Sequence, residues 1–479
     1  MTTVHTPSAT PNYMAVGTNF GHVRLHHFPC IPEESECHRF PSHCGSIANV
    51  RFNFDETHLL TAGLHDRTVV QWKAIAHDED AEVQILDLPE SEDFRLEARE
   101  LSDLGEDFMP ENGSCVDGVL NAGKKTDPKE LQSSPSIDAW FESVVPPLHP
   151  PKQHTSIPDM SVKLEYCYGF TSEGLRNQIR YTKSGDVVFA AGTLGVCMTR
   201  GNRSQQFFQR HTDAITSFAV SKDGSLCATG QMGHEAVACV WDTSTSKLIA
   251  TIPDVHSHSV SSMAFSNNMK MLVTVGLDVD HTVSVYEWET GTTVSRSYSG
   301  TAHVFDTCFS SDDQGLITCG QKDIKFWSGI MGHTPTFIRP ALGAVGNLQP
   351  FLCCAYFAGS PLIGTIDGNL YQFVDDKLKT AVKAHDGNLS AMHVSPTGTE
   401  VVTGGKDGAC RIWNVHLECT KEIAITSVWP DSPNPAVKSV AYNADGNNII
   451  VGTKGAEILE VAVRSGALVG KPLLTGHGT

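Results

Sequence analysis

The sequence predicts an all-β fold made of repeated four-stranded antiparallel sheets. A short pattern that ends in Trp or Phe recurs at Trp241, Trp288, Trp327, Phe373 and Trp413, with spacings of 47, 39, 46 and 40 residues. Each copy carries alternating apolar residues and a tight turn such as "KDG", "PTG" or "ADG", which is typical of antiparallel hairpins. Because one unit cannot bury both of its faces, we expect about seven units to close into a β-propeller.

The N-terminal residues repeat the same pattern. "TAGLHDRTVVQWK" (Thr61 to Lys73) corresponds to "TGGKDGACRIWN" (Thr403 to Asn414). Residues 13–73 contain the end of one blade and most of another, which is too little for a ring. We therefore expect residues 1–76 to be the terminal blade units of a preceding propeller. Two arrangements stay open: these blades pack against the main ring, which we favour, or they complete a second ring with a partner.

The main propeller is expected to occupy residues 161–479. Its opening unit is expected to begin with "VKLEYCYGF" at Val162, and seven units then reach about Thr475. Before it, residues 77–108 hold thirteen acidic and two basic residues, which accounts for −11 of the net charge of −19. We interpret residues 77–160, which end near the proline cluster "VVPPLHPP", as an extended acidic linker.

Composition excludes several classes of function. The net charge of −19 argues against nucleic acid and anionic membranes as partners. No run of apolar residues is long enough to span a bilayer. The N-terminus "MTTVHTPSATPNY" has neither the basic nor the apolar region of a secretory signal. We therefore expect the fourteen cysteines to be reduced thiols in the cytoplasm.

Repeated polar residues in the blades favour a structural role over a catalytic one. Histidines open the blades and aspartates occupy the tight turns, and a catalytic group would not recur at blade spacing. We expect these side chains to hydrogen-bond one another and the buried backbone. The residues are His43, His211, His258, His303 and His385, with Asp66 and Asp407.

No cofactor or metal site is expected. The residues Cys30, Cys37, His38, His43 and Cys44 lie close together in the sequence but lack a C-x₂₋₄-C pair. "GVLNAGKKT" (Gly118 to Thr126) is not a phosphate-binding loop, because Lys125 stands where that motif needs Ser or Thr. Cys353 and Cys354 are adjacent on a strand and should point to opposite faces. We expect no enzymatic activity.

Surface recognition remains, and the basic residues are its candidates. We expect contacts with an acidic partner from Arg176 with Arg180, from Arg200 with Arg203 and Arg210, and from Lys322 with Lys325. The alternative for each cluster is an ordinary solvated face.

The segment "LEYCYGFTSEGLRNQIRYTKSGDVVFAAGTLGVCMTRGNRSQQFFQRHTD" (Leu164 to Asp213) resembles the HELP motif of the echinoderm microtubule-associated protein-like family. Residues 13–73 are similar to the closing repeats of that family's tandem propeller of WD40 repeats. The resemblance implies a non-enzymatic protein that binds tubulin or microtubules and other cytoskeletal or axonemal proteins. The implied location is the cytoplasmic cytoskeleton, including cilia and flagella. The alternative is a general WD40 scaffold for complexes unrelated to microtubules.

Overall fold

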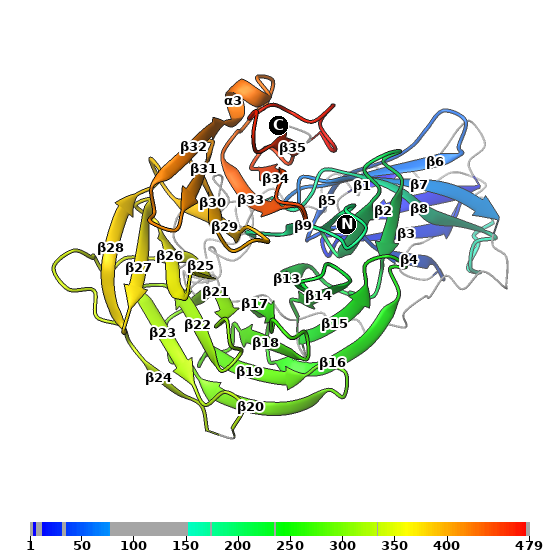
Figure 1. Ribbon diagram of the computed structural model, residues 1–479. Coiled ribbons are helices and arrows are strands. Elements are labelled where there is room, and N and C mark those ends of the chain that lie inside the picture. The colour runs from blue at the N-terminus through cyan, green and yellow to red at the C-terminus, as the bar shows by residue number, and fades with distance from the viewer. Residues whose placement is uncertain are drawn as a thin grey trace, which may run out of the picture.

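The computed structural model describes residues 3–5, 12–30, 35–76, 152–172, 175–233, 236–332 and 334–475. Nearly all regular structure in this part of the chain is antiparallel β-sheet, with one short helix, α3 (Ile425–Val428). Seven sheets form a ring, and two further sheets lie beside it (Figure 1). The all-β propeller predicted from the sequence is confirmed. No helix among the described residues has the length and apolarity to cross a membrane.

The ring sheets follow one another along the chain, and each runs from an innermost to an outermost strand (Figure 1). Their strands, in order, are β9 (Ile179–Tyr181), β10 (Val187–Ala191), β11 (Leu194–Met198) and β12 (Gln205–Phe208); β13 (Ile215–Val220), β14 (Leu226–Gln231), β15 (Ala236–Asp242) and β16 (Leu248–His256); β17 (Val260–Phe265), β18 (Met271–Gly276), β19 (Thr282–Glu287) and β20 (Thr292–Tyr298); β21 (Val304–Phe309), β22 (Gly315–Gly320), β23 (Asp323–Ser328) and β24 (Thr336–Ile338); β25 (Phe351–Phe357), β26 (Ser360–Thr365), β27 (Asn369–Val374) and β28 (Lys377–Lys383); β29 (Leu389–Val394), β30 (Glu400–Gly405), β31 (Ala409–Asn414) and β32 (Cys419–Ala424); and β33 (Val437–Tyr442), β34 (Asn448–Thr453) and β35 (Ile458–Ala462).

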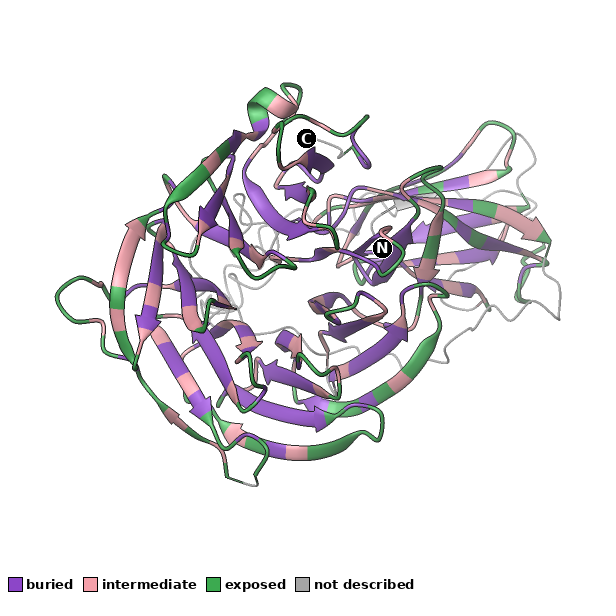
Figure 2. Ribbon diagram, in the orientation of Figure 1, coloured by how far each residue is buried: buried purple, intermediate pink, exposed green. Residues whose placement is uncertain are grey.

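The middle strands of each sheet carry most of the core. In β10 every residue is buried, whereas the outermost strand β16 exposes most of its first half (Figure 2). This follows from the stacking of blades, since neighbouring sheets cover both faces of a middle strand. Cys353 and Cys354 belong to separate hydrophobic clusters on either side of β25, so the prediction that they point to opposite faces is confirmed.

The ring closes between its first and last sheets. β9 packs against β33 and β34, and the Ile179 amide donates a hydrogen bond to Ser439 Oγ at 3.1 Å. The carboxylate of Glu460 accepts hydrogen bonds from Arg200 at 2.6 Å, from Tyr181 at 3.1 Å and from Asn448 at 3.1 Å. One buried carboxylate therefore ties the first blade to the last.

The last ring sheet has three strands. Residues 468–474 run along its open edge, where Leu474 bridges to Ile458 and Leu468 bridges to Val461. This segment covers part of β35 without forming a full fourth strand.

The two sheets beside the ring are built from the N-terminal residues and one later strand. The first contains β1 (Thr3–His5), β2 (Tyr13–Gly17), β3 (His22–His27) and β4 (His38–Pro41), and the second contains β5 (Ile47–Phe52), β6 (His58–Gly63), β7 (Val69–Ala76) and β8 (Met160–Tyr168). We call them the N-terminal blade pair.

Strand β8 belongs to this blade pair and not to the ring. It runs antiparallel to β7 from Ala76↔Met160 to Val69↔Tyr168. The expectation that Val162 begins the first ring unit is therefore wrong, and the innermost strand of that unit is β9. The physical reason is that the three-stranded sheet β5–β7 needs an outer strand to pair with β7, whereas β9 already supplies the inner strand of the first ring blade.

The N-terminal blade pair packs against the ring through a shared core. One hydrophobic cluster joins residues of the pair, such as Val70 and Trp72, to ring residues such as Val187 and Ile450. Arg67 Nη1 and Ser172 Oγ both donate to the carbonyl of Lys454, at 2.8 and 3.0 Å. The expected linker, residues 77–160, lies outside the described residues except for 152–160.

Gly192 lies where the blade pair meets the ring, and its replacement should loosen that junction. Its φ is +61°, and a Cβ there would lie 2.4 Å from the Ser42 carbonyl oxygen. We expect Gly192→Ala to lower the free energy of unfolding by roughly 1–3 kcal/mol. The change is measurable as a lower urea midpoint and faster limited proteolysis. Gly201→Ala is the matched control, because a Cβ at Gly201 would meet no atom within 4 Å; equal effects of the two changes would contradict the junction.

Glu460 should be the most sensitive polar residue at the ring closure. Glu460→Ala leaves Arg200 and Tyr181 without their shared acceptor, so we expect a loss of about 2–4 kcal/mol. Arg200 is partly exposed, so Arg200→Gln should cost only about 1 kcal/mol. Urea denaturation measures both changes, and the exposed Lys247→Gln serves as a control. A Glu460→Ala protein as stable as the control would show that closure does not depend on this carboxylate.

Candidate functional site

The recurring His, Asp and Thr residues form buried networks inside the blades. His43 contacts Asp66 at 2.9 Å through Nδ1 and Thr61 at 2.8 Å through Nε2, and Trp72 donates to the same Thr61 hydroxyl at 3.1 Å. All four side chains are buried. Such a network fixes the tight turn to the strands.

The same network occurs in two ring blades. His385 joins Asp407 and Thr403, and His211 joins Thr229 and Gln231, where a glutamine replaces the aspartate. The structural role predicted for His43, His211 and His385 is confirmed.

Two histidines behave differently from this expectation. In the blade β17–β20 the network uses His256, which contacts Thr274 at 2.9 Å, so the assignment of His258 to this role was wrong by two residues. Both histidines precede β17 in the sequence, and blade spacing alone could not show which of them joins the network. His303 lines the central cavity, where its ring centroid lies 5.1 Å from that of His281.

The Cys and His side chains described between Cys30 and Cys44 do not come together as a group that could hold a metal ion. His43 is held in its blade network, and His38 Nε2 contacts the Pro158 carbonyl oxygen at 2.9 Å. Among the residues that the structure describes, no three His, Cys, Asp or Glu side chains are grouped so as to hold a metal ion. The "GVLNAGKKT" segment lies outside the described residues.

The topology separates the candidate basic residues. In an antiparallel ring the turns β9–β10 and β11–β12 lie on one face, and the turn β10–β11 and the connections between blades lie on the other. Arg203, in the turn β11–β12, is therefore on one face. Arg210, after β12, and Lys322, in the turn β22–β23, are on the opposite face.

Lys325 and Arg200 are engaged within the protein. Lys325 is 1% exposed, and its ammonium contacts Asp323 and Ser299. Its pKa is lowered, mainly by burial, with Asp323 acting against this. Asp323 stands two residues before Lys325, on the same face of the strand, and this spacing could have revealed the pair. Arg200 is bound to Glu460 at the ring closure.

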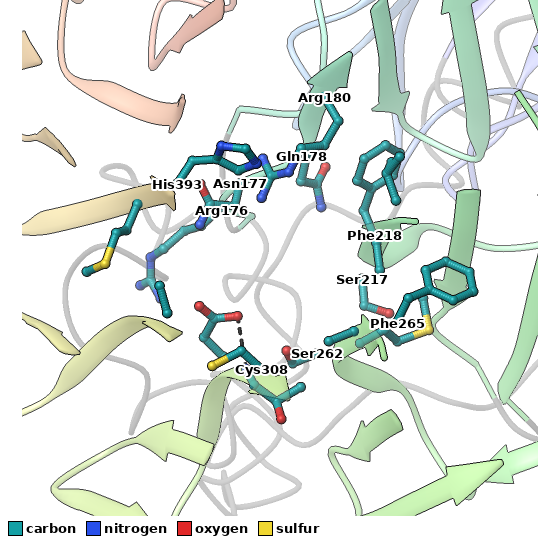
Figure 3. Close-up of a pocket in the computed structure, with 18 of the residues that line it drawn as sticks. Arg176, Asn177, Gln178, Arg180, Ser217, Phe218, Ser262, Phe265, Cys308 and His393 are labelled. Atoms are coloured by element: carbon teal, nitrogen blue, oxygen red, sulfur yellow. Dashed lines mark hydrogen bonds between the residues drawn. The ribbon is translucent and has the colours of Figure 1, made fainter. Parts of the chain in front are cut away.

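Arg176 and Arg180 are directed toward the centre of the ring. A cavity of about 1020 Å³ lies there, lined by the inner strands of the ring blades and by residues 175–183. Figure 3 shows Arg176, Asn177, Gln178 and Arg180 together on one side of this cavity. Asn177 has a positive φ of 54°, so the chain turns there and a simple alternation along the sequence does not predict which of these side chains share a face.

The other walls of the cavity are mixed in polarity. Phe218 and Phe265 contribute apolar surface, and Ser217 and Ser262 contribute hydroxyls (Figure 3). The charged residues of the lining are Arg176, Arg180, Lys183, Lys222, Asp223 and Asp306. Basic groups therefore outnumber acidic ones within a chain whose net charge is −19.

Burial sets the electrostatics of the cavity. Desolvation raises the pKa of Asp306 to about 6, although this carboxylate accepts hydrogen bonds from the amides of Thr307 and Cys354. Desolvation lowers the pKa of Arg180 to about 10, so this guanidinium stays charged near neutral pH. His393 accepts a hydrogen bond from the Tyr442 amide at 3.2 Å, and burial lowers its pKa to about 3, so it is neutral.

Acid should destabilise the fold because of buried neutral histidines. Burial lowers the pKa of His211 to about 4 and those of His303 and His393 to about 3. Unfolding lets all three bind protons below about pH 6.5, so stability is lost as pH falls from 6.5 toward 4. The raised pKa of Asp306 acts in the opposite sense but involves one group. Each histidine contributes a loss of about 2 kcal/mol by pH 5 and Asp306 offsets about 1 kcal/mol, so we expect a net loss on the order of 4 kcal/mol.

Chemical denaturation at several pH values measures this slope. His393→Asn keeps an acceptor for the Tyr442 amide and removes one titrating group, so it should flatten the slope. The same change at the exposed His416 is the control. A slope unchanged by His393→Asn would contradict the assignment.

The chain matches three families of known sequences. Residues 204–461 match the echinoderm microtubule-associated protein first beta-propeller, residues 157–196 match the HELP motif, and residues 34–73 match the WD domain, G-beta repeat. The HELP match contains β8 to β10 and most of β11, and so spans the junction between the blade pair and the ring. The WD match contains β4 to β6 and most of β7 of the blade pair.

Curated relatives show the same relationship. The chain is 26% identical to the ciliary WD repeat-containing protein ctxp80 of Euplotoides octocarinatus, over 68% of this chain and 47% of that protein. It is 28% identical to echinoderm microtubule-associated protein-like 2 of Rattus norvegicus, over 67% of this chain and 51% of that protein. The chain thus spans about half the length of these relatives.

Among solved structures, the β-propeller domain of Myceliophteria thermophila Cps50 (Swd1) is similar with a TM-score of 0.46 and 15% identity, covering 53% of this chain and 85% of that one. The match to the first β-propeller of the echinoderm microtubule-associated proteins covers residues 204–461, more than half of the 479 residues. The chain therefore belongs to the echinoderm microtubule-associated protein family.

Proposed function

We propose that this chain is a non-enzymatic microtubule-associated protein that binds tubulin or the microtubule lattice through the surfaces of its propeller. The observation that carries the proposal is the family match over residues 204–461, joined to the HELP match over residues 157–196. Relatives named echinoderm microtubule-associated protein-like and a relative named ciliary support a cytoskeletal partner. The proposed location is the cytoplasmic cytoskeleton, including the axoneme of cilia and flagella.

The proposed domain organisation is a ring together with two blades of a second unit. In it, residues 1–76 supply the closing blades of a tandem propeller, residues 77–160 are a linker, and residues 161–479 carry the HELP-like motif and the main propeller, with β8 completing the second of the closing blades and the ring beginning at β9. The pairing of β7 with β8 supports this, because it holds the two units together.

The binding surface is proposed on the loops of one ring face. Arg210 and Lys322 both lie on the face that carries the connections between blades, whereas Arg203 lies on the other. A chain with net charge −19 gains little from diffuse attraction to an acidic lattice. The contact is therefore proposed to depend on matched shape, with a few local basic residues.

Co-sedimentation with taxol-stabilised microtubules at rising salt tests the proposal, with size-exclusion chromatography on unpolymerised tubulin as a second measurement. We expect saturable binding that persists at moderate salt, because shape-matched contacts are less screened than exposed charges. Arg210→Gln with Lys322→Gln should weaken binding about three- to tenfold.

Arg203→Gln, on the opposite face, is the matched control for this pair. An unaffected double variant would remove this face from the proposal. Absence of binding to both microtubules and tubulin at low salt would contradict the function and favour a general WD40 scaffold for other complexes.

A further inference from the structure

Three cysteine side chains meet where the blade β21–β24 packs against the blade β25–β28. Cys308 lies in β21, Cys319 in β22 and Cys354 in β25, and one hydrophobic cluster contains all three. The Cys354 thiol is within hydrogen-bond reach of the thiols of Cys308 and Cys319. All three are free thiols, and together they do not form a metal site.

The register of the strands explains why these side chains meet. Across β21 and β22, Asp306 lies opposite Cys319 and Cys308 lies opposite Ile317. Opposite residues share a face of the sheet, as do residues two apart along one strand. The Asp306 carboxylate accepts a hydrogen bond from the Cys354 amide at 2.9 Å. The face that carries both Cys308 and Cys319 is therefore the one held against β25.

Cys308 and Cys354 are the pair best placed to form a disulfide. Cys308 and Cys319 are diagonal neighbours in one sheet, and such positions lie about 7–8 Å apart, which exceeds the usual span of a disulfide. Cys319 is fully buried and is not part of the cavity lining. Cys308 is half-buried and lines the central cavity together with Cys354 (Figure 3). A small oxidant that enters the cavity therefore meets Cys308.

We propose that Cys308 and Cys354 are a modification site, at which a peroxide forms a reversible disulfide that joins β21 to β25 at the wall of the central cavity. In the first step the O–O bond of the peroxide breaks, the Cys308 sulfur becomes a sulfenic acid, and one water leaves. In the second step the Cys354 sulfur bonds to the Cys308 sulfur and the S–O bond breaks. The hydroxyl group leaves with the Cys354 proton as a second water, so two thiols are oxidised and one peroxide is reduced.

Burial sets the order of these two steps. It raises the pKa of the Cys354 thiol well above its ordinary value and also raises the pKa of Cys319. Both groups are therefore poor nucleophiles toward free peroxide. Cys308 reacts first, and Cys354 reacts once its neighbour carries the sulfenic acid. Because a protonated thiol attacks slowly, we expect the disulfide to form slowly.

Peptide mapping of the intact chain after treatment with a small excess of hydrogen peroxide tests the proposal. The remaining thiols are alkylated under denaturing conditions before digestion with chymotrypsin. Phe309 and Leu316 lie between Cys308 and Cys319, so cleavage at these residues places the two cysteines in different peptides. We expect the peptide that contains Cys308 to be joined to the one that contains Cys354, and dithiothreitol should separate them.

Cysteine variants assign the two sulfur atoms. Cys308→Ser and Cys354→Ser should each abolish the cross-linked peptide. Cys353→Ser is the matched control, because Cys353 is adjacent to Cys354 but packs in the cluster on the other side of β25; this variant should form the disulfide as the unaltered chain does. Urea midpoints under reducing conditions show whether each variant folds, and Cys308→Ser, at a half-buried position, decides the result if Cys354→Ser does not fold.

The disulfide should also change stability. It closes the loop between Cys308 and Cys354 in the unfolded chain, so peroxide should raise the urea midpoint of the unaltered chain and of Cys353→Ser. The midpoint of Cys308→Ser should not rise, and dithiothreitol should reverse the gain.

Three results would overturn the proposal. They are a folded, peroxide-treated chain without the cross-linked peptide, a cross-link that contains Cys319 in place of Cys308, and a cross-link that persists in folded Cys354→Ser. The experiment contains no tubulin or other partner. Its outcome is therefore independent of the proposed function, which co-sedimentation tests separately.

Discussion

The middle strands of the ring blades are buried on both faces, and the rest of the structure follows from how the chain covers them. Seven blades cover one another only if the last meets the first, and β9 therefore packs against β33 and β34. The carboxylate of Glu460, held by Arg200, Tyr181 and Asn448, fixes that meeting point. Because the ring is closed, its inner strands surround a central cavity, and the loops at its two faces become the available recognition surfaces.

The parts of this fold that the sequence predicts are the local ones. Turn chemistry and alternation within some 40 residues are enough to identify a blade, and the network of His43, Asp66, Thr61 and Trp72 follows from residues within one blade. The pairing of β8 with β7 could not be predicted in the same way. It joins segments that are 84 residues apart, from Ala76 to Met160, and depends on which sheet edge is open in the folded state.

The candidate site, too, was predictable from the sequence only in its local features. Sequence reasoning selected Arg176 and Arg180 for their charge, but their approach to a cavity depends on ring closure, which no local pattern reports. It treated Lys325 as a surface residue, although Asp323 on the same face of the strand satisfies its ammonium in the interior. Asn177 and Gln178 lie within the HELP match, which assigns neither a role, and Asp306 lies in none of the patterns that sequence analysis singled out; their place at the cavity is seen only in the folded ring.

The pairing of β8 with β7 also has a consequence for how the chain is synthesised. A ribosome completes β7 at Ala76, but the strand that pairs with it does not exist until Tyr168 has been added. At about 5–20 residues per second, that delay of 92 residues lasts roughly 5–18 s. During this interval the edge of β7 is a template for any other extended chain. The acidic residues that are synthesised in between, with their like charges, are then well placed to keep neighbouring nascent chains apart.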